Sequence, residues 1–233
     1  MSSDKDSNKS ALIIKADTSI CGDELTLVES QFRLQSIETI TVSVSSLEEL
    51  EETFDKFRDD DAKFDYFYLC AHGNTGEFGI NDIGVPWSQL ALLICTRGIL
   101  SENAMVLLAC CKGGFYRVAC ELMASCLSIN AVCGVTWTVL PEDLSAGFTV
   151  FVYNIEQKRA EPRYAAEKAT LATDFTFKCT TRDDLYESNA YSDIRHLLFY
   201  EFGWIDDNGN WISTDTEISS VVDYPVPVIS DPA

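Results

Sequence analysis

The chain has 233 residues, of which 46% are hydrophobic, and its 17 basic and 37 acidic side chains give a net charge of −20. We expect no binding to nucleic acid, because so few basic side chains cannot neutralise phosphates. No run approaches the roughly 18 apolar residues that span a membrane, and the polar segment 1–10 is unlike a signal peptide. The sequence predicts a cytoplasmic protein with no membrane contact: a disordered segment at 1–10, one domain at 11–215 and an extended tail at 216–233.

Nine cysteines and two histidines, His72 and His196, are the side chains best suited to nucleophilic or metal chemistry. The odd number of cysteines and the lack of an export signal favour free thiols over disulfides. No CxxC motif occurs and two histidines are few for zinc, so no metal or other cofactor is expected. His196 has no glycine loop or cysteine near it in sequence and is interpreted as structural. Five cysteines in apolar surroundings are predicted to be core residues: Cys70, Cys95, Cys120, Cys126 and Cys133.

The first half of the chain contains three apolar or β-branched runs typical of strands, at 11–16, 39–44 and 65–71. A turn-rich segment with a short helix is expected at 17–30. Ser46, with Glu49 three residues later, forms a capping box that begins a helix, and the charged residues 58–61 end it. Residues 77–85 are typical of a hairpin with its turn at Asn81-Asp82.

The second half continues the alternation of helices and strands. A helix is predicted from Pro86 to Gly98, and another at 115–125 lies between strands at 104–109 and 129–136. Residues 137–143 are expected to form a loop, followed by helices at 144–156 and 164–171. Further on, 195–203 favours a strand and 204–213 a hairpin.

Two segments place reactive residues directly after a predicted buried strand, Asp65–Gly73 and Ala104–Gly114. The first ends at His72-Gly73, and the second ends at Cys110-Cys111, followed by Lys112 and two glycines. Because a helix lies between these strands, they are expected to be parallel and close neighbours, with their carboxyl ends at one edge of the sheet. Open α/β sheets build their sites at that edge. His72 and Cys110 are therefore a candidate base and nucleophile.

A cysteine peptidase needs a thiol close to ionisation, a group that transfers protons and donors for the oxyanion. We expect the helix after Cys110, together with Lys112, to lower the pKa of the Cys110 thiol. His72 is the natural acid and base near neutral pH. The backbone N–H groups of Gly73 and Cys110 are the candidate oxyanion donors.

The order of strand, His72-Gly73, helix, strand and Ala109-Cys110-x-x-Gly113 resembles the caspase-like cysteine peptidases, and in particular their CHAT branch. Residues 77–93 are similar to the segment that CHAT domains carry between the histidine and the cysteine. Residues 135–139 (VTWTV) and the helices after them are similar to the Trp-containing strand end of CHAT domains, so the likeness covers roughly 11–175. Cys111 departs from the residue usual after the nucleophile, but the Ala109 and Gly113 spacing favours Cys110.

The resemblance implies an α/β fold, a caspase-like three-layer sandwich with a mainly parallel six-stranded sheet and helices on both faces. It implies a cysteine endopeptidase that cleaves a protein substrate without a cofactor, with His72 as acid and base and Cys110 as nucleophile. CHAT proteins of bacteria often act in defence or programmed cell death, so a regulatory or sensor protein is an expected partner. The oxyanion would be held by the N–H groups of Gly73 and Cys110.

Trp137, Glu142 and Asp143 are candidate substrate-binding residues. CHAT domains often carry an acidic residue four positions after the tryptophan, where this chain has Pro141, with Glu142 and Asp143 directly after it. A carboxylate in the first specificity pocket favours a basic P1 side chain by charge pairing.

The main alternative is a catalytically silent caspase-like interaction module, against which the intact His72 and Cys110 argue. A nucleotide-binding α/β domain has little support, because the first strand is not followed by GxGxxG and no GxxxxGK[ST] occurs. A serine hydrolase would require a GxSxG motif, which is also missing.

Overall fold

The core of the structure is a six-stranded sheet in the order β2–β1–β3–β6–β7–β8. It is seen in a computed structural model that describes residues 9–16 and 22–187. The first five strands in this order are parallel to one another, and β8 is antiparallel to β7. The strands are β1 (Ser10–Lys15), β2 (Glu38–Ser43), β3 (Phe64–Cys70), β6 (Leu100–Ala109), β7 (Ile129–Val135) and β8 (Phe177–Thr181).

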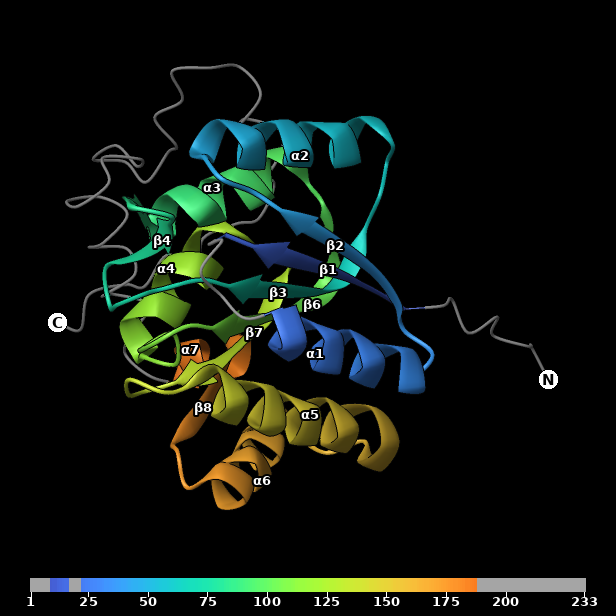
Figure 1. Cartoon of the computed structure of the whole chain (residues 1–233), viewed down its shortest axis with the longest axis vertical. Helices are drawn as coiled ribbons and strands as arrows, with labels where there is room; N and C mark the ends of the chain where they lie inside the picture. Colours follow the sequence, from blue (N-terminus) through green and yellow to red (C-terminus); the bar gives the residue numbers. More distant parts are fainter. Residues whose placement is uncertain (1–8, 17–21, 188–233) are drawn as a thin grey trace, which may run out of the picture.

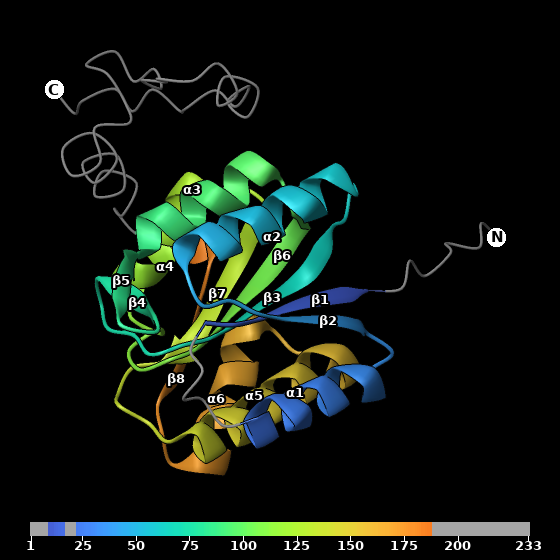
Figure 2. The same ribbon diagram turned by 45° about the horizontal axis from the view of Figure 1, so that its top comes forward.

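Helices cover both faces of this sheet, so the fold is a three-layer α/β sandwich, as predicted (Figure 1, Figure 2). One face carries α2 (Leu47–Asp59), α3 (Trp87–Arg97) and α4 (Tyr116–Ser125). The other carries α1 (Gly22–Leu34), α5 (Pro141–Lys158) and α6 (Pro162–Thr173). A short α7 (Arg182–Glu187) follows β8.

Alternating side chains of the central strands fill the two hydrophobic cores. In β3, Phe67 and Leu69 pack toward α2, α3 and α4, whereas Tyr66 and Tyr68 pack toward α1 and α5. Strands that are buried on both faces are nearly continuous apolar runs. This is why the strands at 65–71 and 104–109 could be identified from sequence.

A small hairpin of β4 (Glu77–Ile80) and β5 (Ile83–Pro86) follows the loop after β3. Its turn is at Asn81, which has a left-handed φ of 51°. Gly98, with a φ of 59°, ends α3, and the side chain of Ser46 accepts a hydrogen bond from the Glu49 N–H at the start of α2. The predicted hairpin and these two helix ends are confirmed.

Three parts of the predicted element map were wrong. The short helix expected within 17–30 is the 13-residue α1, which runs on to Leu34. The loop expected at 137–143 ends earlier, because α5 begins at Pro141. Strand β8 and helix α7 were not predicted, because β8 is only five residues long and its apolar residues are interrupted by Lys178.

The remaining predictions fall outside the described residues. These are the strand at 195–203, the hairpin at 204–213, the tail at 216–233, the structural role of His196 and residues 1–8 of the segment predicted to be disordered at 1–10. Within that segment Ser10 begins β1, so the prediction of disorder was wrong at this residue. Among the described residues, no helix is both long and apolar enough to cross a membrane.

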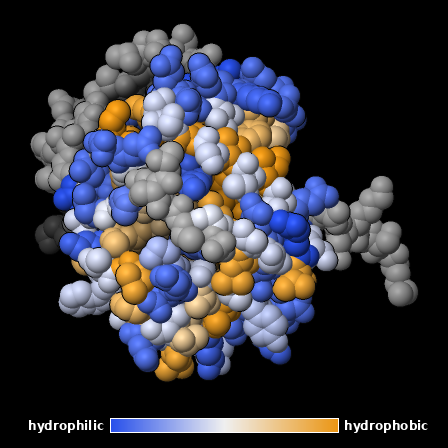
Figure 3. Space-filling view, in the orientation of Figure 1, coloured by the Kyte–Doolittle hydropathy of each residue, from blue (hydrophilic) through white to orange (hydrophobic). Residues whose placement is uncertain are grey.

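Strand β2 forms one edge of the sheet and is largely exposed. Ile40 in this strand is 44% exposed. Hydrophobic surface is visible in this region below α2 (Figure 3).

Candidate active site

The carboxyl ends of β3 and β6 bring the two predicted motifs to the same edge of the sheet. Cys70 pairs with Ala109 in the parallel register, and the Ala71 N–H donates a hydrogen bond of 3.3 Å to the Ala109 carbonyl. His72-Gly73 and Cys110 therefore begin the loops that leave two neighbouring strands. The predicted adjacency of these strands is confirmed.

The Cys110 thiol is enclosed by two glycines. A Cβ atom placed on Gly73 would lie 3.1 Å from both Cβ and Sγ of Cys110, and one placed on Gly113 would lie 2.8 Å from Sγ. Any side chain at Gly113 would collide with the sulfur. This close packing leaves Cys110 only 1% exposed.

The electrostatics of Cys110 differ from the sequence-based expectation. Burial raises the pKa of the Cys110 thiol well above its ordinary value, and the neighbouring Cys111 raises it further. The Gly113 N–H donates a hydrogen bond to the sulfur and opposes this change, but burial is the larger effect. The expected lowering of the pKa by the following helix and Lys112 is therefore wrong for this conformation, in which the thiol is protonated at neutral pH.

His72 is exposed in the loop that follows β3, and backbone hydrogen bonds hold this loop in place. Its carbonyl accepts a 2.8 Å hydrogen bond from the Gly79 N–H, and the Asn74 N–H donates to the Glu77 carbonyl at 2.9 Å. These two bonds lie on either side of the isolated antiparallel β-bridge between Gly73 and Phe78. Neither of them uses the Gly73 N–H. The β4–β5 hairpin thus fixes the backbone of the predicted base and of one predicted oxyanion donor.

The loop after Cys110 is packed tightly onto the end of β7. The Lys112 N–H donates to the Trp137 carbonyl at 3.3 Å, and the Gly114 N–H donates to the Val135 carbonyl at 2.8 Å. A Cβ atom on Gly114 would lie only 2.2 Å from the Gly134 carbonyl oxygen. These contacts bring Trp137 beside the Cys110 loop, where its side chain is 66% exposed and open to a ligand.

The two predicted acidic residues lie in the first turn of α5, not in a loop. Carboxylates at this position stabilise a helix by interacting with its N-terminal dipole, which is a structural role for both residues. Glu142 is exposed, and its charge makes a small contribution to the raised pKa of Glu24 in α1. The Asp143 N–H donates a hydrogen bond to the Leu140 carbonyl at 3.2 Å, which fixes this residue in the first turn of the helix.

Glu24 is a residue of this region that the sequence reasoning missed. It is 6% exposed and accepts hydrogen bonds from the Tyr68 hydroxyl at 3.2 Å and from the Cys70 thiol at 3.5 Å. Burial raises the pKa of Glu24 to about 7. Burial is also the main cause of the raised pKa values of Tyr68 and Cys70, to both of which Cys110 adds, so this polar cluster lies close to the Cys110 thiol. The available signal was an acidic residue directly before apolar Leu25 and one helical turn before apolar Val28, on the buried side of a helix.

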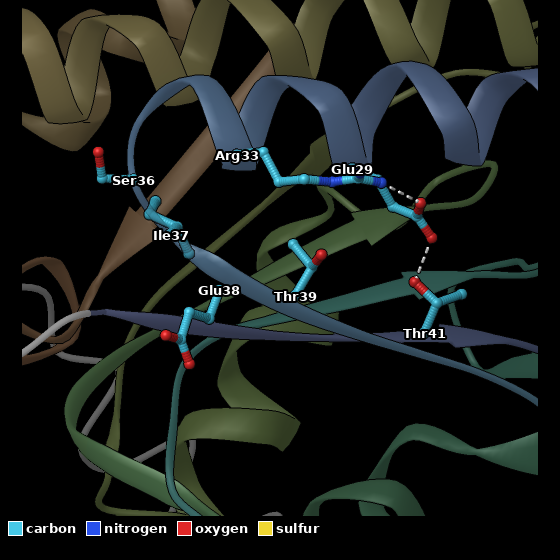
Figure 4. Close-up of a pocket in the computed structure, with 7 residues that line it drawn as sticks. All are labelled: Glu29, Arg33, Ser36, Ile37, Glu38, Thr39 and Thr41. Carbon is cyan, nitrogen blue, oxygen red and sulfur yellow. Dashed lines mark hydrogen bonds and ion pairs between the residues drawn. The ribbon is translucent and has the colours of Figure 1, made fainter.

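An open groove of about 890 Å³ lies elsewhere, along the exposed edge strand β2 (Figure 4). Within it, Glu29 forms an ion pair with Arg33 at 2.9 Å and accepts a hydrogen bond from the Thr41 hydroxyl. The groove follows the end of α1 and the beginning of β2, away from the carboxyl ends of the strands. Its lining residues, none of which is a predicted site residue, are Glu29, Arg33, Ser36, Ile37, Glu38, Thr39 and Thr41.

Within 9–16 and 22–187, no group of three or more His, Cys, Asp or Glu side chains is arranged to hold a metal ion. The sequence matches no protein-family model, and no curated protein matches it. The resemblance to caspase-like peptidases therefore depends on the His72 and Cys110 motifs and on the order of the elements around them.

Proposed function

We propose that this chain is a cysteine endopeptidase in which Cys110 is the nucleophile and His72 is the general acid and base. One observation carries the proposal: His72-Gly73 and Cys110 leave neighbouring parallel strands at the same edge, with Gly73 in contact with the thiol. A histidine and a cysteine at the carboxyl edge of an α/β sheet are the minimum needed for acyl transfer.

In the proposed reaction, His72 accepts the Cys110 proton as the sulfur attacks the carbonyl carbon of a peptide bond. The oxyanion is stabilised by the backbone N–H groups of Gly73 and Cys110. His72 then protonates the leaving amine, and water hydrolyses the acyl-enzyme. The absence of a side chain at Gly73 lets a peptide backbone come close to the sulfur.

The buried, protonated thiol indicates how this activity would be regulated. A thiol that is 1% exposed, with a pKa raised by burial, is a poor nucleophile until water or substrate reaches it. A protein partner or a bound substrate that separates the Gly73 and Gly113 loops would supply that access. Control of this kind fits a protease of defence or cell death, which must stay inactive until a signal arrives.

Substrate preference is proposed to be for a basic P1 side chain. Glu142 is exposed in the first turn of α5, shortly after Trp137, which lies beside the Cys110 loop. A carboxylate in the first specificity pocket favours a guanidinium or ammonium group by charge pairing. Peptides that differ only at P1 test this point, and a preference for acidic P1 side chains would contradict it.

A silent interaction module is the second candidate, and the raised pKa of the enclosed Cys110 thiol favours it. The two functions are separated by incubating the purified chain with a proteome-derived peptide library, alone and with lysate of its source cells. New termini that depend on Cys110 and persist in Cys111→Ala establish the protease. Termini that are the same for wild type and Cys110→Ala under both conditions would favour the silent module.

A further inference from the structure

We propose that the edge strand β2 is a self-association surface, at which two copies of this chain pair their β2 strands in antiparallel orientation and join their sheets. An edge strand carries unpaired backbone N–H and C=O groups, and monomeric proteins protect such strands with lysine, proline, bulges or a covering element. β2 contains no lysine or proline and pairs with β1 in an unbroken register. Among residues 9–16 and 22–187, no strand pairs with its outer side. The other edge strand, β8, is only five residues long and carries the exposed Lys178.

The backbone hydrogen bonds of β2 show which of its groups point away from the sheet. The Glu38 N–H donates to the Lys9 carbonyl and the Val44 N–H donates to the Lys15 carbonyl, both at 2.9 Å. Every second residue of a paired strand directs its N–H and C=O groups toward the same neighbour. The even-numbered residues of β2 therefore face β1. The backbone groups that face outward belong to Thr39, Thr41 and Ser43.

The two faces of β2 differ in chemistry, because successive side chains point to opposite faces of a sheet. The odd-numbered residues carry hydroxyl groups and face α1, where the Thr41 hydroxyl donates to Glu29 (Figure 4). Ile40 and Val42 face the other side, where Val42 packs against the core beneath α2. Ile40 is 44% exposed. The open groove beside β2 on the α1 side leaves room for a second strand at this edge.

The pattern of β2 is complementary to its own copy in one register. Antiparallel pairing needs outward-facing residues opposite each other, and the longest overlap places Thr41 opposite Thr41 of the second copy. Thr39 then lies opposite Ser43, and about six backbone hydrogen bonds can form. On the other face, Ile40 lies opposite Val42 in the closely spaced pairs, so that the exposed part of Ile40 is covered by an apolar side chain. Hydroxyl residues thus meet hydroxyl residues, and apolar residues meet apolar residues.

The charges near β2 are compatible with this two-fold pair. Glu38, the only charged residue of the strand, lies opposite Val44, so no like charges face each other. Near the axis, the Glu29 carboxylate is balanced by Arg33 at 2.9 Å. The net charge of −20 makes two copies repel each other over longer distances, and salt at about 0.1 M screens this repulsion beyond about 10 Å. Added salt should therefore strengthen the dimer, whereas it would weaken the binding of a basic peptide strand at the same edge.

The antiparallel arrangement also determines where the candidate active sites lie in the dimer. His72 and Cys110 follow the carboxyl ends of strands that are parallel to β2. In the paired sheets, the carboxyl ends of the two copies point in opposite directions, so the two sites lie at opposite edges of the joined sheet. The proposal does not depend on protease activity.

The test is sedimentation equilibrium of the full chain under reducing conditions, from about 2 to about 200 μM, the range in which a small interface dissociates. The monomer has a mass of 25.9 kDa. The average mass should rise toward twice this value with concentration, and it should rise further at about 0.5 M salt than at about 0.1 M salt. Hydrogen exchange at low and high concentration locates the interface. The amides expected to exchange more slowly in the dimer are those of Thr39, Thr41 and Ser43.

Two substitutions with matched controls complete the test. Ile40→Lys places a charge in the interface and should abolish the dimer, whereas Ile83→Lys, at a 57% exposed position in the β4–β5 hairpin, should dimerise as wild type does. Thr41→Pro removes the central outward N–H and leaves the pairing with β1 intact, so it should also abolish the dimer. Thr41→Val loses only the hydroxyl bond to Glu29 and should retain it.

Three outcomes would overturn the proposal: a chain that remains monomeric at every concentration and salt, a dimer whose slowed amides lie outside β2, or a dimer that Ile40→Lys leaves intact. Hydrogen exchange of the wild-type chain decides the question even if a variant does not fold.

Discussion

Replacement of Glu24 by glutamine should make the protein more stable at neutral pH and should reduce its loss of stability as pH rises. Glu24 is buried and its pKa is raised from 4.5 to about 7, so the folded protein binds this proton more tightly than the unfolded chain does. The resulting penalty is absent below about pH 4.5, grows as pH rises toward 7 and is complete above 7. A shift of this size corresponds to about 3 kcal/mol at pH 8 and about 1 kcal/mol at pH 5.5.

Glutamine keeps an oxygen that can accept the hydrogen bonds from Tyr68 and Cys70, and it carries no charge at any pH. Urea unfolding followed by tryptophan fluorescence at pH 5.5 and at pH 8 measures the effect. The stability of Glu24→Gln minus that of wild type should be about 2 kcal/mol larger at pH 8 than at pH 5.5. Glu48→Gln, at an exposed position in α2, is the control and should show no such change with pH. A difference between Glu24→Gln and wild type that is constant between these pH values would refute the assignment.

Three further substitutions test other parts of the structure. Gly114→Ala should cost about 3 kcal/mol of stability or prevent folding, because the new methyl group would collide with the Gly134 carbonyl. Gly22→Ala is the control and should change the stability by less than about 1 kcal/mol, because a Cβ atom there has nothing within 4 Å. Equal effects of the two substitutions in thermal unfolding would contradict this packing. Trp137→Ala should change the stability by less than about 0.5 kcal/mol, because Trp137 is 66% exposed. The same substitution should raise the KM for peptide cleavage. An unchanged KM would show that Trp137 is not part of the substrate site. Ser46→Ala should cost about 1 kcal/mol in urea unfolding, because the 3.1 Å bond from the Glu49 N–H is lost, and an unchanged midpoint would show that water replaces this cap fully.

The sheet was predictable from sequence where its strands are buried on both faces. Runs such as 65–71 and 104–109 have few polar residues, and the helix between them dictates a parallel arrangement. Strand β8 escaped prediction because it is short, antiparallel and partly polar, so that its pairing with β7 follows from tertiary context. The start of α5 was missed because Pro141 begins the helix immediately after an exposed loop.

The candidate site was predictable in its position but not in its electrostatics. Sequence order alone places His72 and Cys110 at one edge, because each follows a strand. The raised pKa of Cys110 depends on how closely Gly73 and Gly113 enclose the sulfur, and distances of this kind come only from the folded chain. Glu24 was missed for the same reason, since nothing in its neighbourhood in sequence shows that Tyr68 and Cys70 lie against it.

The most direct test of the proposed protease is labelling with a peptidyl acyloxymethylketone, a probe that reacts with an activated catalytic thiol, followed by mass spectrometry of the labelled peptide. Wild type, Cys110→Ala, Cys111→Ala and His72→Ala are compared, alone and with candidate partner proteins. The proposed mechanism predicts a label on Cys110 that persists in Cys111→Ala, is lost in Cys110→Ala and is weakened in His72→Ala. A label on Cys111, or no label on Cys110 with any partner while free cysteines react with iodoacetamide, would contradict it.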